Sequence, residues 1–451
     1  MSSTASPRRT DDTSKIASYS PSQVATAAAT VIFTVLILSF RPFQPAGGAA
    51  EGGGDILNQI GFSLLGGLAV FAMATLAAPR KLAALLSPWW LLMLGFLLLS
   101  ALNAAEPPAA MRAIFFTLIG IVAVAAVLVL PRDGDGFSAV FAFSGAVIVG
   151  LCFVGVLFFP SLAVHGPNVF EPEHVGFWRG IFSHKNIASP VMACYSFAGI
   201  YLARRGWLKS GIALFVFAMI FMANTGSKTT AGLVPLAIVL VIVPNVIGMR
   251  LLVPIVFAAS IIGTALGTLG IVFIPFLNDL WHHYAPDLTY TGRTSLWAFS
   301  GEMISHRPLT GYGYDSFWGT PVVTEIDQVF DRDWDIRNIV HGHNGYMDVA
   351  VMMGLPALAA AVMVLIVQPL RDYLRIPLLK ENVFLGDLFM MIVLFTTLNA
   401  FLESFFFRRV DPVWLFCVLG VLGLRIVSRF PLPSSFEARS GVYHRPAHAK
   451  G

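Results

Sequence analysis

Residues 111–131 read MRAIFFTLIGIVAVAAVLVLP, and this stretch decides the class of fold. Its one charged side chain, Arg112, stands near the start, and the rest is almost wholly apolar over a length that crosses a bilayer as a helix. Outward from it in both directions, the same criterion finds about twelve stretches, which predict an all-α polytopic membrane protein with about 12 transmembrane helices. They lie near residues 22–40, 57–78, 84–103, 111–131, 137–160, 187–204, 207–224, 229–248, 251–277, 346–369, 385–403 and 411–430.

The composition supports this class and excludes several others. Hydrophobic residues make up 56% of the 451 residues and charged residues only 12%, with a mean hydropathy of +0.75. A soluble domain carries about 25% charged residues, so a soluble enzyme, a disordered chain and a nucleic-acid-binding module are excluded. The three cysteines, Cys152, Cys194 and Cys417, lie inside apolar runs, where they indicate helix packing and neither a disulfide framework nor a metal site.

The distribution of cations predicts the orientation. With a cytoplasmic N-terminus, about 18 of the 29 Lys and Arg residues fall on the inner side, as the positive-inside rule requires. We therefore expect a disordered cytoplasmic tail at 1–20, a transmembrane domain at 21–430 and a second cytoplasmic tail at 431–451. The first apolar stretch lacks a small-residue cleavage site and is predicted to be a retained span. Both long loops, at about 161–186 and at 278–345 between the ninth and tenth spans, then face outward, which in a Gram-negative inner membrane is the periplasm.

Orientation does not explain the cations of the outer side. These residues pair with nearby carboxylates or bind an anionic substrate, for which the guanidinium fork of arginine suits phosphate oxygens. Charge alone leaves both alternatives open. The cations concerned include Arg179, Lys185, Lys228, Arg293, Arg307, Arg337, Arg408 and Arg409.

The outer loop before the sixth span ends in EPEHVGFWRGIFSHKN, residues 171–186. Its Arg179, His184 and Lys185 predict either an interfacial anchor or a clamp for phosphate or diphosphate. Farther on, Asn224–Thr229 contains Gly-Ser-Lys-Thr, which is similar to the end of a P-loop. The full P-loop spacing is absent and no strand precedes the segment, so a nucleotide site is not expected. We expect a turn in which Ser227 or Thr229 caps the next helix, and in which Lys228 adds positive charge at the same outer face.

The loop at 278–345 combines an expected helix at 294–305, a turn at Gly311–Tyr314 and many aromatic side chains. Aromatic faces suit both the lipid interface and sugar rings. The loop ends in HGHNGYMDVAVMMG, residues 341–354. His341 and His343 are surface histidines, a weak metal pair, or, since imidazole titrates near neutrality, a general base acting on a sugar hydroxyl.

Taken together, these blocks resemble the bacterial O-antigen ligase and O-antigen/exopolysaccharide polymerase superfamily, over roughly residues 60–425. The shared hallmark is His343-Asn344, nine residues and Gly354, although Ala357 stands where the family usually has Gly, Thr or Tyr. Further matching elements are Arg179–Asn186, Gly292–Thr294, and Asn399-x-x-x-Glu403-Ser404.

The resemblance implies a glycosyltransferase on the periplasmic face of the inner membrane that needs no metal and no nucleotide. Its donor is a glycan on undecaprenyl diphosphate, and its acceptor is a sugar hydroxyl on a lipid-linked repeat unit (polymerase) or on lipid A–core (ligase), with inversion at the anomeric carbon. The RGIFSHKN block most resembles the exopolysaccharide polymerase branch, so we favour polymerase over ligase. A secondary transporter and a structural assembly protein remain as alternatives of another class. A chain-length regulator is an expected further partner of such pathways.

The resemblance and the chemistry of the residues together give each candidate a role. His343 removes the acceptor proton, and Arg179 and Arg293 stabilise the leaving diphosphate, where one preorganised donor can contribute about 3–4 kcal/mol. Lys185 and Lys228 are the next diphosphate ligands. Asn344 or His341 orients His343, with no ranking between them, and Glu403 either orients an imidazole or arginine or pairs near Arg408. His184 and Tyr314 complete the supporting set.

Overall fold

The computed structural model describes residues 20–44, 55–167, 172–284, 290, 292–326 and 335–433. Apart from an isolated bridge between Val164 and Trp178, the regular structure in these ranges is helical. The expected tails at 1–20 and 431–451 lie almost wholly outside the described residues. The elements are α1 Pro21–Leu38, α2 Ile56–Leu76, α3 Pro79–Leu85, α4 Pro88–Ser100, η1 Ala101–Asn103, α5 Pro107–Val129, α6 Gly134–Phe158, α7 Pro160–Ala163, η2 Pro172–His174, α8 Lys185–Arg204, α9 Leu208–Asn224, α10 Lys228–Val246, α11 Leu252–Ala265, η3 Leu266–Gly270, α12 Ile271–Phe273, α13 Pro275–Tyr284, α14 Arg293–His306, α15 Pro321–Thr324, η4 Ile336–Asn338, α16 Gly345–Met353, α17 Leu355–Val362, η5 Met363–Val367, α18 Gln368–Leu374, α19 Lys380–Asn399 and α20 Pro412–Val427.

The expected apolar stretches all fall on helices. Within the described ranges, 9 helices are long and apolar enough to cross a membrane alone, and α3 with α4 forms a further candidate bent by 63°. The shorter apolar helices α9 and α20 account for the remaining two stretches. The prediction of an all-α polytopic membrane protein is therefore confirmed.

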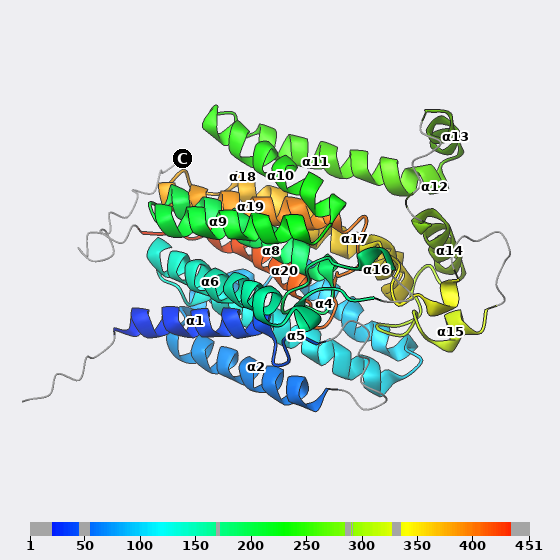
Figure 1. The fold of residues 1–451 in the computed structure, drawn as a ribbon, viewed down its shortest axis with the longest axis horizontal. Helices are drawn as coiled ribbons and strands as arrows, with labels where there is room; N and C mark the ends of the chain where they lie inside the picture. The colour runs from blue at the N-terminus through cyan, green and yellow to red at the C-terminus, as the bar shows by residue number, and fades with distance from the viewer. Residues whose placement is uncertain are drawn as a thin grey trace, which may run out of the picture.

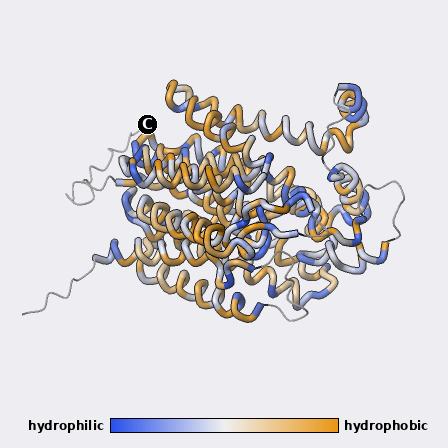
Figure 2. Tube along the Cα trace, viewed as in Figure 1, coloured by the Kyte–Doolittle hydropathy of each residue, from blue (hydrophilic) through white to orange (hydrophobic). Residues whose placement is uncertain are grey.

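The long helices run side by side in one bundle, and α13, α14 and α15 lie together beyond one end of it (Figure 1). Helix α1 begins and α20 ends at the opposite end of the bundle (Figure 1). Apolar residues dominate the length of the bundle helices, whereas the α13–α15 end is more polar (Figure 2). Large apolar side chains such as Leu64, Phe71 and Phe217 are exposed on the bundle, as expected for helices that face lipid.

Helices α8, α19 and α20 form the interior of the bundle, and nearly every residue of α19 and α20 is buried. Helix α8 packs unusually close to α9 because both carry glycine at the contact. A Cβ atom on Gly199 would lie 2.7 Å from the backbone nitrogen of Phe215, so a larger residue there would push the two helices apart. This core fixes the positions of the N-terminus of α8 and the C-terminus of α19, which both enter the candidate site.

Ion pairs link the helices at the end of the bundle where α1 begins and α20 ends. Arg204 Nη1 lies 2.7 Å from Asp387 Oδ2, and Asp387 Oδ1 also accepts hydrogen bonds from Asn245 Nδ2 at 2.7 Å and from the Tyr373 hydroxyl at 3.1 Å. Arg205 pairs with Asp135 and Glu381. Arginines that the sequence assigns to membrane orientation thus also tie helices together.

Two predicted spans have different bounds in the structure. The stretch 346–369 is not one helix, because Gly354 separates α16 from α17 with a φ of +84°. A Cβ there would lie 2.4 Å from the Leu309 carbonyl oxygen, so the close approach of this loop requires glycine. The membrane-crossing helix begins at Leu355. Likewise α19 ends at Asn399, which leaves residues 400–403 in a turn.

Candidate active site

The His-Asn-x9-Gly pattern describes the two ends of helix α16. The side-chain oxygen of Asn344 accepts hydrogen bonds from the backbone N–H groups of Tyr346 and Met347 and so forms the N-cap, while Gly354 forms the C-cap. The nine intervening residues are the helix itself. Residue 343 therefore stands immediately before the N-cap, outside the helix, where its imidazole is not constrained by helical geometry.

Asn344 also attaches α16 to the turn that follows α19. Its backbone N–H donates to Ser404 Oγ at 3.0 Å, and its side-chain Nδ2 donates to the Phe401 carbonyl at 3.1 Å. The next residue, Gly345, donates its N–H to the Ala400 carbonyl at 2.7 Å. The sequence elements around residues 343–354 and 399–404 are therefore one unit in space, and Asn344 acts as its anchor.

The turn His341-Gly342-His343 is held in an unusual conformation. His343 has a φ of +50°, in the left-handed region that costs energy for a residue with a Cβ. Asp348 accepts the Gly342 N–H at 3.1 Å and the Trp318 indole N–H at 2.8 Å. The Gly342 carbonyl in turn accepts the Trp297 indole N–H at 3.2 Å. Sequence reasoning missed Asp348; its signal was a carboxylate inside an apolar run, one helical turn after the N-cap.

Glu403 brings together side chains from three separate segments. Its Oε2 lies 3.7 Å from His343 Nδ1. Its Oε1 lies 3.2 Å from Arg293 Nη2, at the start of α14, and accepts a hydrogen bond of 3.2 Å from Asn186 Nδ2 in the first turn of α8. Two interpretations were open for Glu403: that it orients an imidazole or an arginine, or that it pairs near Arg408. The geometry favours the first, because Arg408 Nη1 donates to the Ser404 carbonyl.

The charges around Glu403 keep it ionised. Burial alone would raise its pKa, but the neighbouring His343, followed by the charge of Arg293, lowers the pKa below the ordinary glutamate value. The neighbouring His341 ring lies 4.2 Å from the His343 ring, centroid to centroid. Burial, reinforced by the charges of His343 and Arg408, lowers the pKa of His341 well below its ordinary value. His341 is therefore neutral near pH 7 and offers no competing charge.

Arg293 keeps hydrogen-bonding capacity beyond its contact with Glu403. Its Nε is buried and has no hydrogen-bond partner in the described part of the chain. A guanidinium has five N–H donors in a planar fork. Arg293 can therefore remain paired with Glu403 through one nitrogen while it donates through others to an anion.

Arg179 and Tyr314 have bonds of a different kind. Arg179 is 3% exposed, and its Nη1 donates to the backbone carbonyls of Gln44 and Phe182; burial lowers its pKa. The buried Tyr314 hydroxyl lies 2.8 Å from Thr117 Oγ1 and donates to the Phe407 carbonyl. The Arg179 bonds join loop segments to one another, the Tyr314 bonds join loops and α5, and neither set involves the Glu403 cluster.

Two further predicted cations, Lys185 and Lys228, lie at the N-termini of α8 and α10. His184 is the N-cap of α8, and its Nδ1 accepts the Asn186 N–H at 3.1 Å. Lys185 Nζ lies 4.4 Å from the centroid of the Phe177 ring. The same ring fills the space beside Gly226, in the turn that precedes the exposed Lys228. Ser227, one of the two expected caps, forms the N-cap of α10, so Lys185 and Lys228 are the first residues of α8 and α10.

His165, His174 and His184 form a cluster that the sequence did not reveal. Each offers a ring nitrogen, and these atoms lie within 4.8 Å of one another. However, His165 Nε2 accepts the Lys185 N–H at 3.1 Å, and His184 Nδ1 accepts that of Asn186. In the neutral rings the remaining nitrogens of these two residues then carry the proton, at the positive end of α8. This donor set fits an anion better than a metal cation.

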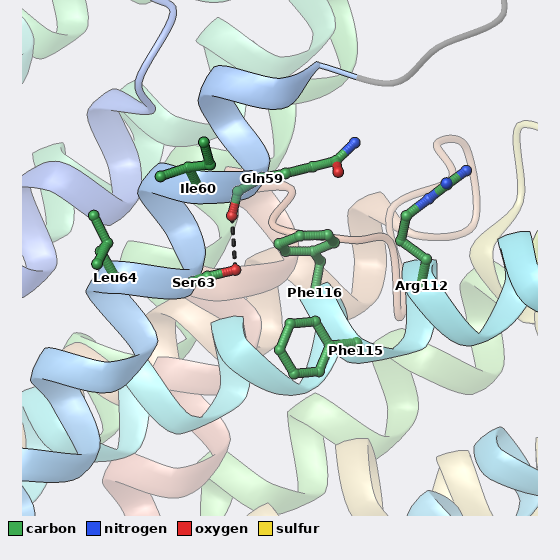
Figure 3. Close-up of a pocket in the computed structure, with 7 residues that line it drawn as sticks. All are labelled: Gln59, Ile60, Ser63, Leu64, Arg112, Phe115 and Phe116. Atoms are coloured by element: carbon green, nitrogen blue, oxygen red, sulfur yellow. Dashed lines mark hydrogen bonds between the residues drawn. The ribbon is translucent and has the colours of Figure 1, made fainter.

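A hollow of about 500 Å³ lies apart from these residues, between α2 and α5 on the outside of the bundle. Gln59 and Arg112 extend over one end of it, and Phe115 and Phe116 flank its middle (Figure 3). Ile60, Ser63 and Leu64 complete the lining. Its apolar walls suit a hydrocarbon chain, and it shares no residue with the Glu403 cluster.

Comparison with known proteins finds a family that part of the chain resembles. The sequence model described as "O-Antigen ligase" matches residues 211–362, a region that contains Arg293, the two-histidine turn and all of α16. This region of the chain is similar to the O-antigen ligase family. It is also similar to the exopolysaccharide production protein ExoQ of Rhizobium meliloti (strain 1021), with 24% identity over 205 residues that cover 39% of this chain and 47% of that relative. The chain thus spans about half the length of this relative. The resemblance inferred from the motifs is confirmed, as is a multi-pass membrane protein.

Proposed function

We propose that this chain is a metal-independent glycosyltransferase of the inner membrane that works on the periplasmic face. In this proposal it transfers a glycan from undecaprenyl diphosphate to a sugar hydroxyl, and it acts as an exopolysaccharide or O-antigen polymerase. The observation that carries the proposal is the Glu403 cluster, in which one partly buried carboxylate contacts both a histidine and an arginine. Such a site pairs a proton acceptor with a ligand for a leaving anion.

His343 is the proposed general base. Its Nδ1 faces Glu403, so the carboxylate favours the tautomer with the proton on Nδ1 and leaves the Nε2 lone pair for the acceptor hydroxyl. The hydroxyl oxygen attacks the anomeric carbon, the bond from that carbon to the diphosphate oxygen breaks, and the hydroxyl proton passes to Nε2. Glu403 then stabilises the imidazolium, as carboxylates do beside catalytic histidines.

Arg293 is the proposed principal ligand of the diphosphate. Charge grows on the departing oxygen, and the unused donors of the Arg293 guanidinium lie beside the same carboxylate that orients His343. Lys185 and Lys228, the first residues of α8 and α10, with His184 as the N-cap of α8, would add positive potential for the second phosphate. Arg179 is retained as a candidate ligand, acting from within its carbonyl contacts.

The acceptor separates polymerase from ligase. Purified protein supplied with lipid-linked repeat units alone should form a ladder of longer glycans if it is a polymerase. Without a ladder, but with transfer once lipid A–core is added, the chain would be a ligase. Resemblance of Arg179–Asn186 to the polymerase branch and similarity to an exopolysaccharide production protein favour the first result.

A further inference from the structure

Three aromatic rings form a ladder that leads to the two-histidine turn. Trp281 of α13 stacks on Tyr290 with ring centroids 5.8 Å apart and planes inclined by 20°. Tyr290 in turn contacts Trp297 of α14 at 5.6 Å. Two rings of the ladder are held in place, because the Tyr290 hydroxyl donates to the Gly267 carbonyl at 2.7 Å and Trp297 is fully buried. Its last ring donates to the carbonyl of Gly342, between His341 and His343.

Membrane anchoring does not account for Trp281. Helix α13 carries exposed Phe276, Leu280 and Tyr284 at four-residue intervals, with exposed fractions of 72%, 43% and 76%. These side chains share one helical face, which suits the lipid interface. Trp281 lies on a neighbouring face, is only partly exposed, and is turned toward Tyr290.

We propose that Trp281 is the outer platform of a glycan-binding subsite. The inference deepens the proposed function, on which it rests, by naming a place where the saccharide chain binds outside the reacting centre. The C–H groups on the face of a pyranose ring pack against the electron-rich face of an indole, and an immobilised ring loses little entropy on binding. Because Trp297 is bonded to Gly342, a sugar held at Trp281 has a fixed position relative to His343.

The matched control lies on the same helix. Trp281→Ala removes the platform, whereas Phe276→Ala removes an exposed ring from the other face of α13 and leaves the ladder intact. Trp281→Phe keeps an aromatic face and should keep most of the binding. The variants are made in full-length, detergent-solubilised protein that also carries His343→Ala, so that only binding and no transfer is measured.

The probe is cellotetraose, a neutral saccharide of flat pyranose rings, and binding is followed by saturation-transfer NMR. We expect saturable binding in the parent and in Phe276→Ala, and about tenfold weaker binding in Trp281→Ala at an unchanged melting temperature. Equal binding in Trp281→Ala and Phe276→Ala would overturn the proposal, as would the lack of saturable binding in the parent.

The outcome is separable from that of the proposed function. Cellotetraose binding that depends on Trp281, in a chain whose wild type transfers no glycan, would refute the transferase and keep the subsite. Transfer that is intact in Trp281→Ala, with no change in KM for the lipid-linked substrate, would refute the subsite and keep the transferase.

Discussion

Asp387 and Glu403 are carboxylates at opposite ends of the same helix, and their surroundings differ. Asp387, near the start of α19, accepts bonds of 2.7 Å from Arg204, 2.7 Å from Asn245 and 3.1 Å from Tyr373. Glu403, just beyond the end of α19, has contacts of 3.2 Å with Arg293, 3.2 Å with Asn186 and 3.7 Å with His343. The Asp387 carboxylate thus accepts three hydrogen bonds, two of them short, whereas the contacts of the Glu403 carboxylate are longer.

The difference separates a structural role from a chemical one. Short hydrogen bonds from Arg204 and Asn245 to Asp387 hold α8, α10 and α19 together at the end of the bundle where α1 begins. At the other end, Arg293 Nε has no hydrogen-bond partner among the described residues. Catalytic hydrogen bonds are often long without substrate and shorten when substrate binds. We therefore expect mutations at Asp387 to act on stability and those around Glu403 to act on turnover.

The largest effect on turnover is expected for His343→Ala. Loss of the general base should reduce the rate of glycan transfer by about 10²–10⁴-fold. The melting temperature should stay close to that of the wild type, because the imidazole is partly exposed and α16 is capped by Asn344. Initial rates with lipid-linked repeat units measure the effect, and near-wild-type rates would remove His343 as the base.

Asp387→Ala should have the largest effect on stability. It leaves Arg204 without its buried partner, and breaking a buried pair in this way costs about 3–5 kcal/mol. We expect a lower melting temperature and lower yield, while the folded fraction retains wild-type turnover. A variant that melts normally but has lost its activity would reverse the roles assigned to the two ends.

Arg293→Ala should reduce transfer by about 10²–10³-fold, the effect of losing one preorganised donor at a developing anion. Arg293→Lys should recover only part of the rate, since the fork is lost. Arg179→Ala serves as the contrast, because it also removes bonds to the Gln44 and Phe182 carbonyls and should lower the melting temperature along with activity. Full activity in Arg293→Ala would reassign the diphosphate site.

Asp348→Ala should reduce turnover by about tenfold. The hydrogen bond from Gly342 to Asp348 holds His343 in its left-handed conformation, which costs about 1–3 kcal/mol. The readout is the rate measured beside that of Trp318→Phe, which removes a single bond to the same carboxylate and should have a smaller effect. Equal rates in Asp348→Ala and the wild type would show that the His343 turn keeps its conformation without Asp348.

The smallest effect expected is a dependence of stability on pH. The pKa of Glu403 is lower in the folded protein than its ordinary value, so the ionised form stabilises the fold. The excess in melting temperature of the wild type over Glu403→Gln should be fully present at neutral pH and should shrink as the pH falls through and below the ordinary glutamate range. A difference that grows on acidification would contradict this assignment.

Local patterns predicted the helices and the family resemblance, because apolar length and motif spacing are properties of single segments. The bounds of α16 and α19 were missed, since apolar composition continues through Gly354 and past Asn399. Residues that meet only through the fold were also missed: the spacing of His165, His174 and His184 does not show that their rings come together, and Asp348 lies within an apolar run. Arg179 and Tyr314 are buried and donate to backbone carbonyls, and the spacing of residues in a motif carries no information on burial.

The most direct test of the account is a double-mutant cycle between His343 and Glu403, read as initial rates of glycan transfer. If Glu403 acts by orienting and stabilising the His343 imidazole, His343→Ala and the double variant with Glu403→Gln should transfer at the same low rate. Glu403→Gln alone should fall between that rate and the wild type. Rate losses that multiply in the double variant would show that the two residues act independently, and would contradict the catalytic pair.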